Sequence, residues 1–200
     1  MSKILVIGAR GRAGRAAVDE ARRRGHEVTA VARTADGGLV AGDVTDPGQI
    51  AELASGHDAV IAAVYDGGTD FFTKASRALV DGLEKAGVSR LVWVGLASIL
   101  PTADGTLLMD TPTYPQGYRA FYLAHQAALD TFAASTLDWV SIAPAGDFSH
   151  ADPTRTGAYR ITPADASSLI SYADLAIALV DEVERPTHHH TAIGAVRSDT

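Results

Sequence analysis

The sequence predicts an α/β protein of the Rossmann type, in which a doubly wound parallel sheet carries helices on both faces. Short β-branched runs alternate with longer helix-periodic segments, as expected for consecutive βαβ units. The first run, Ile4–Ile7, leads directly into the glycine-rich turn Gly8–Gly14 and an alanine-rich helix. The length of 200 residues and the 46% hydrophobic content suit a single domain spanning residues 1–200.

Each expected strand is a short apolar run that ends at turn residues. In chain order the strands are Ile4–Ile7, Glu27–Ala32, Leu39–Ala41, Asp58–Val64, Arg90–Val94, Asp138–Ala143 and Thr191–Val196. Each expected helix has apolar residues at helical spacing and is bounded by a capping residue, a proline or a glycine. In chain order the helices are Gly11–Arg24, Pro47–Leu53, Thr69–Ala86, Gly117–Ser135 and Tyr172–Glu184.

Local signals support these boundaries. Asp46 precedes Pro47, which combines an N-cap acceptor with a proline at the first helical position. Gly25 and Gly87 follow basic or apolar helix ends, as C-terminal caps do. Between the fifth strand and the fourth helix, residues Ser98–Gln116 form a long polar loop, and loops of this length are usually functional or disordered.

Composition excludes several classes of function. The net charge of -7 disfavours nucleic-acid binding, and the absence of cysteine removes disulfides and thiolate chemistry. No apolar stretch reaches the roughly 18 residues of a membrane span. We therefore expect a cytoplasmic protein with a small-molecule substrate, as a monomer or homodimer, without membrane or metal binding. The run His188–His190 is expected at a surface edge or turn, because adjacent extended residues point to alternating faces.

The three glycines of the turn predict a dinucleotide site. Gly8 permits the tight turn, Gly11 lets the backbone approach a pyrophosphate, and Gly14 allows the helix to pack closely on the strand. Arg12 and Ala13 begin the helix, where unpaired N–H groups and the positive end of the dipole favour phosphate. A tight turn without nucleotide binding is the alternative interpretation.

The residues after the second strand favour NADP(H) over NAD(H). No carboxylate occupies Val31–Thr34, where one would bind the adenosine ribose of NAD. Arg10 and Arg33 are instead placed to hold a 2′-phosphate, unless both are solvated surface arginines or Asp36 folds back to a ribose. Further along the chain, Asp43 either accepts from an adenine amino group or caps the following helix. The small residues at the end of the fourth strand leave room for the adenosine half; they are Ala62 and Ala63.

With these features in place, the sequence resembles the atypical short-chain dehydrogenases of the NAD(P)H-binding, NmrA-like type, and within them the group of NADH-flavin reductases and biliverdin reductase B. Further motifs carry the resemblance over nearly the whole chain: Asp110-Thr111-Pro112-x-Tyr114-Pro115, Pro144, Gly157-x-Tyr159-Arg160 and Ile170-Ser171-Tyr172-Ala173-Asp174. The resemblance implies NADPH binding, a small C-terminal region that forms a substrate pocket over the nicotinamide, and flavins, quinones or related conjugated acceptors as substrates.

One departure from the wider superfamily affects the expected chemistry. Orthodox members pair a tyrosine with a lysine four residues later, which lowers the phenol pKa for proton transfer. Lysine occurs here only at Lys3, Lys74 and Lys85, and no tyrosine precedes one at that spacing. The alcohol-oxidising unit is therefore absent, and hydride transfer with little proton chemistry from the protein remains.

Other candidate residues lie after the fifth and sixth strands and on the fourth helix. Ser98 stands at the carboxyl edge of the sheet, where open α/β sheets bind ligands. Tyr118, Tyr122 and His125 share one helix face and orient a substrate or donate a proton if that face meets the cleft; ordinary packing is the alternative. The backbone from Pro144 to Ala145 is a candidate contact for the nicotinamide carboxamide.

Three functions agree with these features. The leading hypothesis is an NADPH-dependent reductase of a small conjugated acceptor. The second is an isomerase, dehydratase or cyclase that retains the cofactor and uses the tyrosines or His125 for acid–base chemistry. The third is a non-catalytic sensor that binds NADP(H) and reports its redox state, which requires different affinities for the oxidised and reduced forms.

Overall fold

The computed structural model describes residues 1–68 and 70–198. A central eight-stranded sheet has the strand order β3-β2-β1-β4-β5-β6-β10-β8. All neighbouring strands run parallel except β10 and β8. The chain leaves β1 toward β2 on one side and later returns to β4 on the other, so a topological switch point lies between β1 and β4. The predicted doubly wound Rossmann fold is confirmed.

The strands are short, and the central ones β1, β4, β5 and β6 are largely buried, as parallel strands covered on both faces are. In chain order they are β1 Lys3–Ile7, β2 Glu27–Ala32, β3 Val40–Ala41, β4 Ala59–Ala62, β5 Arg90–Val94, β6 Asp138–Pro144, β7 Asp147–Phe148, β8 Tyr159–Thr162, β9 Leu169–Ile170 and β10 Thr191–Arg197. The α-helices are α1 Arg12–Arg23, α2 Pro47–Ala54, α3 Phe71–Ala86, α4 Arg119–Ala133 and α5 Tyr172–Glu184.

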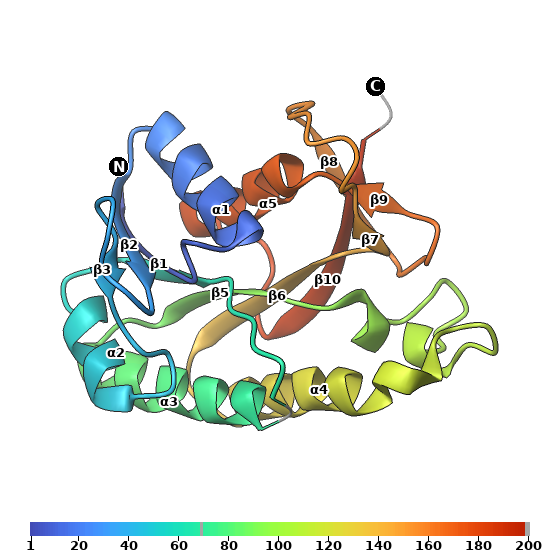
Figure 1. The fold of residues 1–200 in the computed structure, drawn as a ribbon, viewed down its shortest axis with the longest axis horizontal. Helices are drawn as coiled ribbons and strands as arrows, with labels where there is room; N and C mark the ends of the chain where they lie inside the picture. Colours follow the sequence, from blue (N-terminus) through green and yellow to red (C-terminus); the bar gives the residue numbers. More distant parts are fainter. Residues whose placement is uncertain (69, 199–200) are drawn as a thin grey trace.

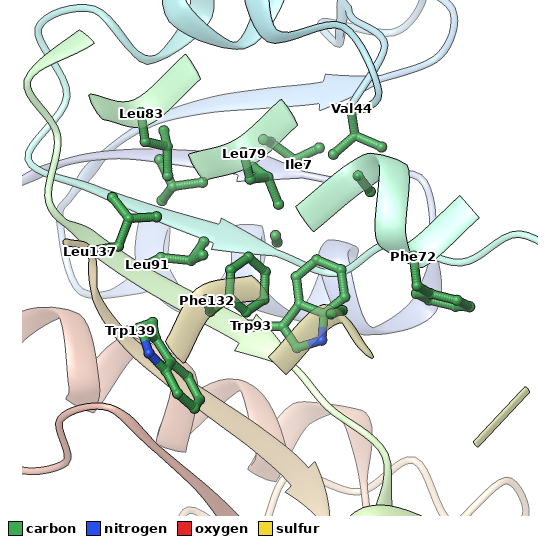
Figure 2. Close-up of a cluster of buried hydrophobic side chains, with 14 of the residues drawn as sticks. Ile7, Val44, Phe72, Leu79, Leu83, Leu91, Trp93, Phe132, Leu137 and Trp139 are labelled. Atoms are coloured by element: carbon green, nitrogen blue, oxygen red, sulfur yellow. The ribbon is translucent and has the colours of Figure 1, made fainter. Parts of the chain in front are cut away.

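Helices cover both faces of the sheet (Figure 1). Helices α1 and α5 pack together on one face, and α2, α3 and α4 form a continuous layer on the other. Within the second layer the largest apolar side chains meet the sheet: Trp93 of β5 contacts Phe132 of α4 edge to face, with 5.3 Å between ring centroids. Figure 2 shows these two rings beside Leu79, one of the leucines that α3 contributes. Burying each such side chain contributes about 1.5–3 kcal/mol to folding.

The expected elements are present, with ends that shift by a few residues. Asp46 caps α2 by accepting hydrogen bonds from the backbone N–H groups of Gly48 and Gln49, as its position before proline predicts. The helix expected from Thr69 is observed from Phe71, and Thr69 itself lies outside the described residues. The turn over Gly87 adopts φ 72° and closes α3.

Two parts of the chain differ from the expectation. The segment between Ser98 and Gln116 contains three short 3-10 helices, Ala97–Ile99, Leu108–Asp110 and Gln116–Tyr118, rather than a featureless loop. The region after β6 adds the antiparallel edge strand β8 and a small β7-β9 sheet. The sequence does not predict these short strands. β8 lies at the edge of the sheet with half-buried or exposed residues, so it lacks the alternation of apolar and polar side chains that indicates a strand.

Candidate functional site

The glycine turn brings backbone atoms closer together than any side chain would permit. Gly8 has φ 84°, and a Cβ atom on it would lie 2.0 Å from the carbonyl oxygen of Ala63 at the end of β4. A Cβ atom on Gly14 would lie 2.2 Å from the carbonyl oxygen of Gly8. The N–H groups of Gly8 and Ala9 both donate to the carbonyl oxygen of Val31 and fix the turn to β2. The start of α1 is therefore held tightly against the switch point.

No side chain caps the N-terminus of helix α1, so the N–H groups of its first turn have no side-chain acceptor. Gly11 is the N-cap residue, so no side chain caps the helix, and its first turn holds no acidic residue. Arg12 and Ala13 follow in that first turn. Because the N-cap of α1 is a glycine and no side chain caps the helix, its first N–H groups can donate hydrogen bonds to an external anion.

A cavity of about 640 Å³ opens beside this turn. Its size falls in the range of small-molecule and cofactor sites. The lining residues come from the carboxyl ends of β1 to β4 and from the start of α3; among them are Gly8, Arg10, Gly11, Arg33, Asp43, Ala63, Tyr65 and Phe71. Six of the residues expected to bind a cofactor therefore border one cavity at the switch point.

Both arginines that line this cavity form ion pairs with exposed carboxylates. Arg10 donates to the carboxylate of Asp36 at 2.6 Å and to the side chain of Thr34 at 3.1 Å. Arg33 lies 3.5 Å from the carboxylate of Asp66, with its side chain 85% exposed. Exposed ion pairs of this kind contribute only about 0–1 kcal/mol, so a phosphate could displace either carboxylate at little cost.

One of the two alternative roles expected for Asp43 is contradicted by the structure. Its carboxylate accepts from the N–H and the hydroxyl of Thr45, which forms a local turn in front of α2. The helix itself is capped by Asp46, so the capping role expected for Asp43 is wrong. Asp43 borders the cavity, which leaves it placed for a ligand group.

A hydroxyl pair lies at the carboxyl end of β5. Ser98 is completely buried in the 3-10 turn that follows the strand, and its Oγ lies 2.9 Å from the hydroxyl of Tyr114. Tyr114 belongs to the long segment before α4 and is half-buried. Its ring packs against that of Tyr122, with 5.5 Å between centroids. The sequence reasoning included Tyr114 in a family motif without giving it a role.

The face of α4 that carries three candidate residues is mostly packed into the protein. Tyr118 is 66% exposed at the N-terminal end of the helix. The hydroxyl of Tyr122 donates to the carbonyl oxygen of Pro115, and burial, together with the nearby phenols, raises its pKa. His125 is 5% exposed between Phe72 and Phe121, and burial lowers its pKa to about 4.

His125 therefore belongs to the core. Its ring lies 3.9 Å from that of Phe72, centroid to centroid, and neither ring nitrogen has a hydrogen-bond partner among the described residues. A buried imidazole without a partner stays neutral at physiological pH and cannot exchange protons with a substrate in the cleft. Of the two alternatives given for this helix face, ordinary packing therefore holds for His125.

Three further candidates lie outside the cavity. Ala62 is completely buried within β4, so of the two alanines expected there Ala63 lines the cavity and Ala62 does not. Ala145 donates its N–H to Ala195 and accepts at its carbonyl from Asp165, which leaves its backbone without a donor for a carboxamide. Pro144 is the last residue of β6 and has no N–H.

Two histidines of the run at residues 188–190 contact different acidic side chains. His188 contacts Glu182 and His189 contacts Asp138, so the two rings point to different partners. Across residues 1–68 and 70–198, no three histidine or acidic side chains gather in a way that could hold a metal ion. No helix in the same part of the chain has the length and apolar content needed to cross a membrane.

The comparisons with known proteins agree with this geometry. The model of the NAD(P)H-binding family matches residues 8–186. The chain belongs to that family. The matched region begins at Gly8, the first residue of the turn that closes against β4, and ends two residues beyond α5.

Three similar solved structures cover nearly the whole chain. A putative exported protein from Burkholderia pseudomallei is 36% identical, with a TM-score of 0.87 over 98% of this chain and 100% of its own. A putative NADH-flavin reductase from Streptococcus pneumoniae is 31% identical, with a TM-score of 0.83 over 99% and 100%. A putative epimerase from Bacteroides thetaiotaomicron is 33% identical, with a TM-score of 0.84 over 100% and 98%.

The residues at the switch point fit a bound dinucleotide. The close approach of Gly8 to β4 and of Gly14 to Gly8 leaves no space for a side chain at either position, as a pyrophosphate cradle requires. The uncapped start of α1 supplies N–H donors, and Arg10 and Arg33 line the cavity beside it with positively charged side chains. These features agree with the membership of the chain in the NAD(P)H-binding family.

Proposed function

We propose that the protein is an NADPH-dependent reductase of a small conjugated acceptor, such as a flavin or a quinone. One observation carries the proposal: a cavity lined by the glycine turn lies at the switch point, and the hydroxyl pair that follows β5, Ser98 and Tyr114, has no lysine partner in sequence. The name of the similar Streptococcus pneumoniae protein points to the same class of reaction.

The preference for NADPH rests on the two cavity arginines. A 2′-phosphate between Arg10 and Arg33 would replace the carboxylates of Asp36 and Asp66 as their partner. A phosphate dianion accepts stronger, charge-assisted hydrogen bonds than an exposed carboxylate pair provides. Asp43 would accept from the adenine amino group, and Ala63 would let the adenosine pass close to β4.

The chain's own contribution to chemistry is small in this proposal. A bound reduced nicotinamide supplies the hydride. Ser98 orients the phenol of Tyr114, whose hydroxyl donates a hydrogen bond, and then a proton, to the acceptor atom that gains negative charge. At neutral pH, a phenol that has no neighbouring lysine donates a proton more readily than it accepts one. Tyr114 is half-buried, so water can return its proton.

Rapid mixing of the protein with NADPH and a panel of flavins and quinones tests the proposal. We expect loss of the reduced nicotinamide absorbance with at least one conjugated acceptor and none with simple alcohols or ketones. Gly14→Ala, which closes the pyrophosphate cradle, serves as the cofactor-binding control. Tight NADPH binding with no oxidation by any acceptor would contradict the proposal.

The similar epimerase favours a second candidate, an isomerisation that regenerates the cofactor within each turnover. Such chemistry needs a base at the substrate, and His125 is too deeply packed to serve. Tyr114 is the remaining phenol beside Ser98. Conversion of a substrate into its isomer without net change in NADPH would favour this candidate over the reductase.

A further inference from the structure

Tyr114 lies in a part of the chain that forms neither a helix nor a strand. Residues 111–115 connect two 3-10 helices, and the N–H of Tyr114 donates to the carbonyl oxygen of Thr111 at 3.1 Å. At the other end of the side chain, the phenol oxygen lies 2.9 Å from Oγ of the fully buried Ser98. Because no regular element fixes this segment, the place of the phenol depends on the side chains that contact it.

Polar side chains shape the outer side of the segment. Gln116 donates from its amide to the carbonyl oxygens of Tyr114 at 3.0 Å and Met109 at 2.9 Å. Arg119, the first residue of α4, binds the carboxylate of Asp110 at 2.7 Å. Gln116 and Asp110 are exposed, so water competes for these hydrogen bonds and they add little rigidity.

Tyr122 contacts the same segment from the inside and at two points. Its ring packs against the ring of Tyr114, with 5.5 Å between centroids and 56° between planes. Its hydroxyl donates to the carbonyl oxygen of Pro115 at 3.1 Å. Pro115 follows Tyr114 directly in the chain, so Tyr122 holds Tyr114 both by the ring and by the adjoining backbone. Tyr122 is 6% exposed and belongs to the regular helix α4, which makes it a firmer support than the surface residues.

The surroundings of Tyr122 disfavour direct proton transfer to a substrate. Its one hydroxyl proton is donated to Pro115, so it is not available to another acceptor while that hydrogen bond persists. Burial, and after it the nearby phenols of Tyr114 and Tyr118, raise the pKa of Tyr122. A buried phenol that keeps its proton and uses it inside the protein affects the reaction through the residue that it supports.

We propose that Tyr122 is a positioning residue, which holds Tyr114 so that the phenol stays on Ser98 and directs its proton to the acceptor. The inference rests on the proposed reductase function and assigns a residue to it. Ser98 donates its hydroxyl proton to the phenol oxygen of Tyr114, which leaves the proton of Tyr114 for the acceptor. The acceptor gains a hydride from the reduced nicotinamide and this proton. The phenolate left on Tyr114 keeps the hydrogen bond from Ser98 until water returns the proton.

Tyr122→Phe tests this role, because it removes the hydroxyl and keeps the ring. The protein has six tyrosines, so isotopic labelling of tyrosine Cζ gives six nuclear magnetic resonance signals, and the signal of Tyr114 is the one lost in Tyr114→Phe. We expect Tyr122→Phe to move this signal in the same direction as Ser98→Ala does, since both weaken the contact between the two hydroxyls. Tyr159→Phe, which removes a hydroxyl that donates to Asp181 at 2.9 Å, is the matched control and should leave the signal in place.

Rapid mixing of the NADPH-saturated protein with a quinone measures the effect on the reaction. Tyr122→Phe should slow the single-turnover rate about tenfold with unchanged NADPH affinity, because a small displacement of a reacting group is costly. In the Tyr114→Phe protein the same change should alter the rate less than about twofold, because the residue that Tyr122 positions no longer donates a proton. Tyr159→Phe should leave the rate unchanged.

Two results would overturn the inference, and a third concerns the proposed function alone. A Tyr114 signal that does not move in Tyr122→Phe would refute the positioning role, whether or not the protein reduces any acceptor. Equal slowing by Tyr122→Phe with and without the Tyr114 hydroxyl would assign Tyr122 to the fold or to direct contact with the acceptor. If the wild-type protein reduces no acceptor, the proposed function fails, and the Tyr114 signal still decides whether Tyr122 positions that phenol.

Discussion

Replacing Arg33 with serine tests how the protein selects its cofactor. The guanidinium is 85% exposed and lies 3.5 Å from Asp66, so its present ion pair contributes at most about 1 kcal/mol. Charge-assisted hydrogen bonds to a 2′-phosphate contribute about 1.5–3 kcal/mol. After a lost ion pair of about 1 kcal/mol is subtracted, Arg33 should contribute about 0.5–2 kcal/mol to NADPH binding, which corresponds to about 2- to 30-fold in Kd.

Calorimetric titration of Arg33→Ser with NADPH and NADH measures this difference directly. We expect the NADPH affinity to fall by that factor and the NADH affinity to change less than about twofold, because NADH has no 2′-phosphate. Arg22→Ser, an exposed arginine in the last turn of α1, is the matched control and should change neither. Asp66→Asn should slightly strengthen NADPH binding, since it removes the competing carboxylate. Equal weakening of both cofactors by Arg33→Ser, or no weakening, would refute the reasoning.

Three further changes test other parts of the site. Gly14→Ala places a Cβ atom 2.2 Å from the Gly8 carbonyl oxygen, so it should lower the unfolding free energy by about 1–3 kcal/mol and abolish NADPH binding. Gly117→Ala adds a methyl group in open space and should have neither effect. A stable Gly14→Ala protein that still binds the cofactor would contradict the packing argument. Tyr114→Phe should slow reduction of a quinone about 10²-fold or more with unchanged NADPH affinity, and an unaltered single-turnover rate would remove Tyr114 from the chemistry. The wild-type protein should lose stability as the pH falls from 6.5 to 4, because the pKa of His125 is about 6.5 in the unfolded chain and about 4 in the folded protein. In His125→Leu, chemical denaturation should show up to about 3 kcal/mol less of this pH-dependent loss. Parallel pH curves for the two proteins would show that the imidazole is not buried.

The glycine turn could be predicted from sequence because its geometry is local. Gly8 and Gly14 are six residues apart, and their contact follows directly from a strand, a tight turn and a helix in succession. The cavity arginines follow in the same way, since Arg10 belongs to the turn and Arg33 to the end of the neighbouring strand β2. A short βαβ unit therefore carries enough information to locate the dinucleotide cavity.

The residues proposed to contact the substrate depend on contacts between segments that are distant in the chain, and the sequence predicts such contacts less well. Helical spacing placed Tyr122 and His125 on one face of α4 but could not show that Phe72, fifty residues earlier, covers that face. Ala145 was expected to contact the cofactor, but its backbone groups are paired with Ala195 and Asp165. Tyr114 lies in an irregular segment without periodicity, so its contact with Ser98 required the fold.

The central claim is that a reduced dinucleotide, bound through its pyrophosphate at the Gly8–Gly14 turn, passes a hydride to a conjugated acceptor. Single-turnover mixing of the protein with flavin mononucleotide and NADPH deuterated in turn on each face of the nicotinamide C4 measures this transfer. The account predicts a primary isotope effect for one face only, with the deuterium leaving the nicotinamide and the effect lost together with cofactor binding in Gly14→Ala. Flavin reduction at the same rate with both labels, or at the same rate in the Gly14→Ala protein, would contradict it.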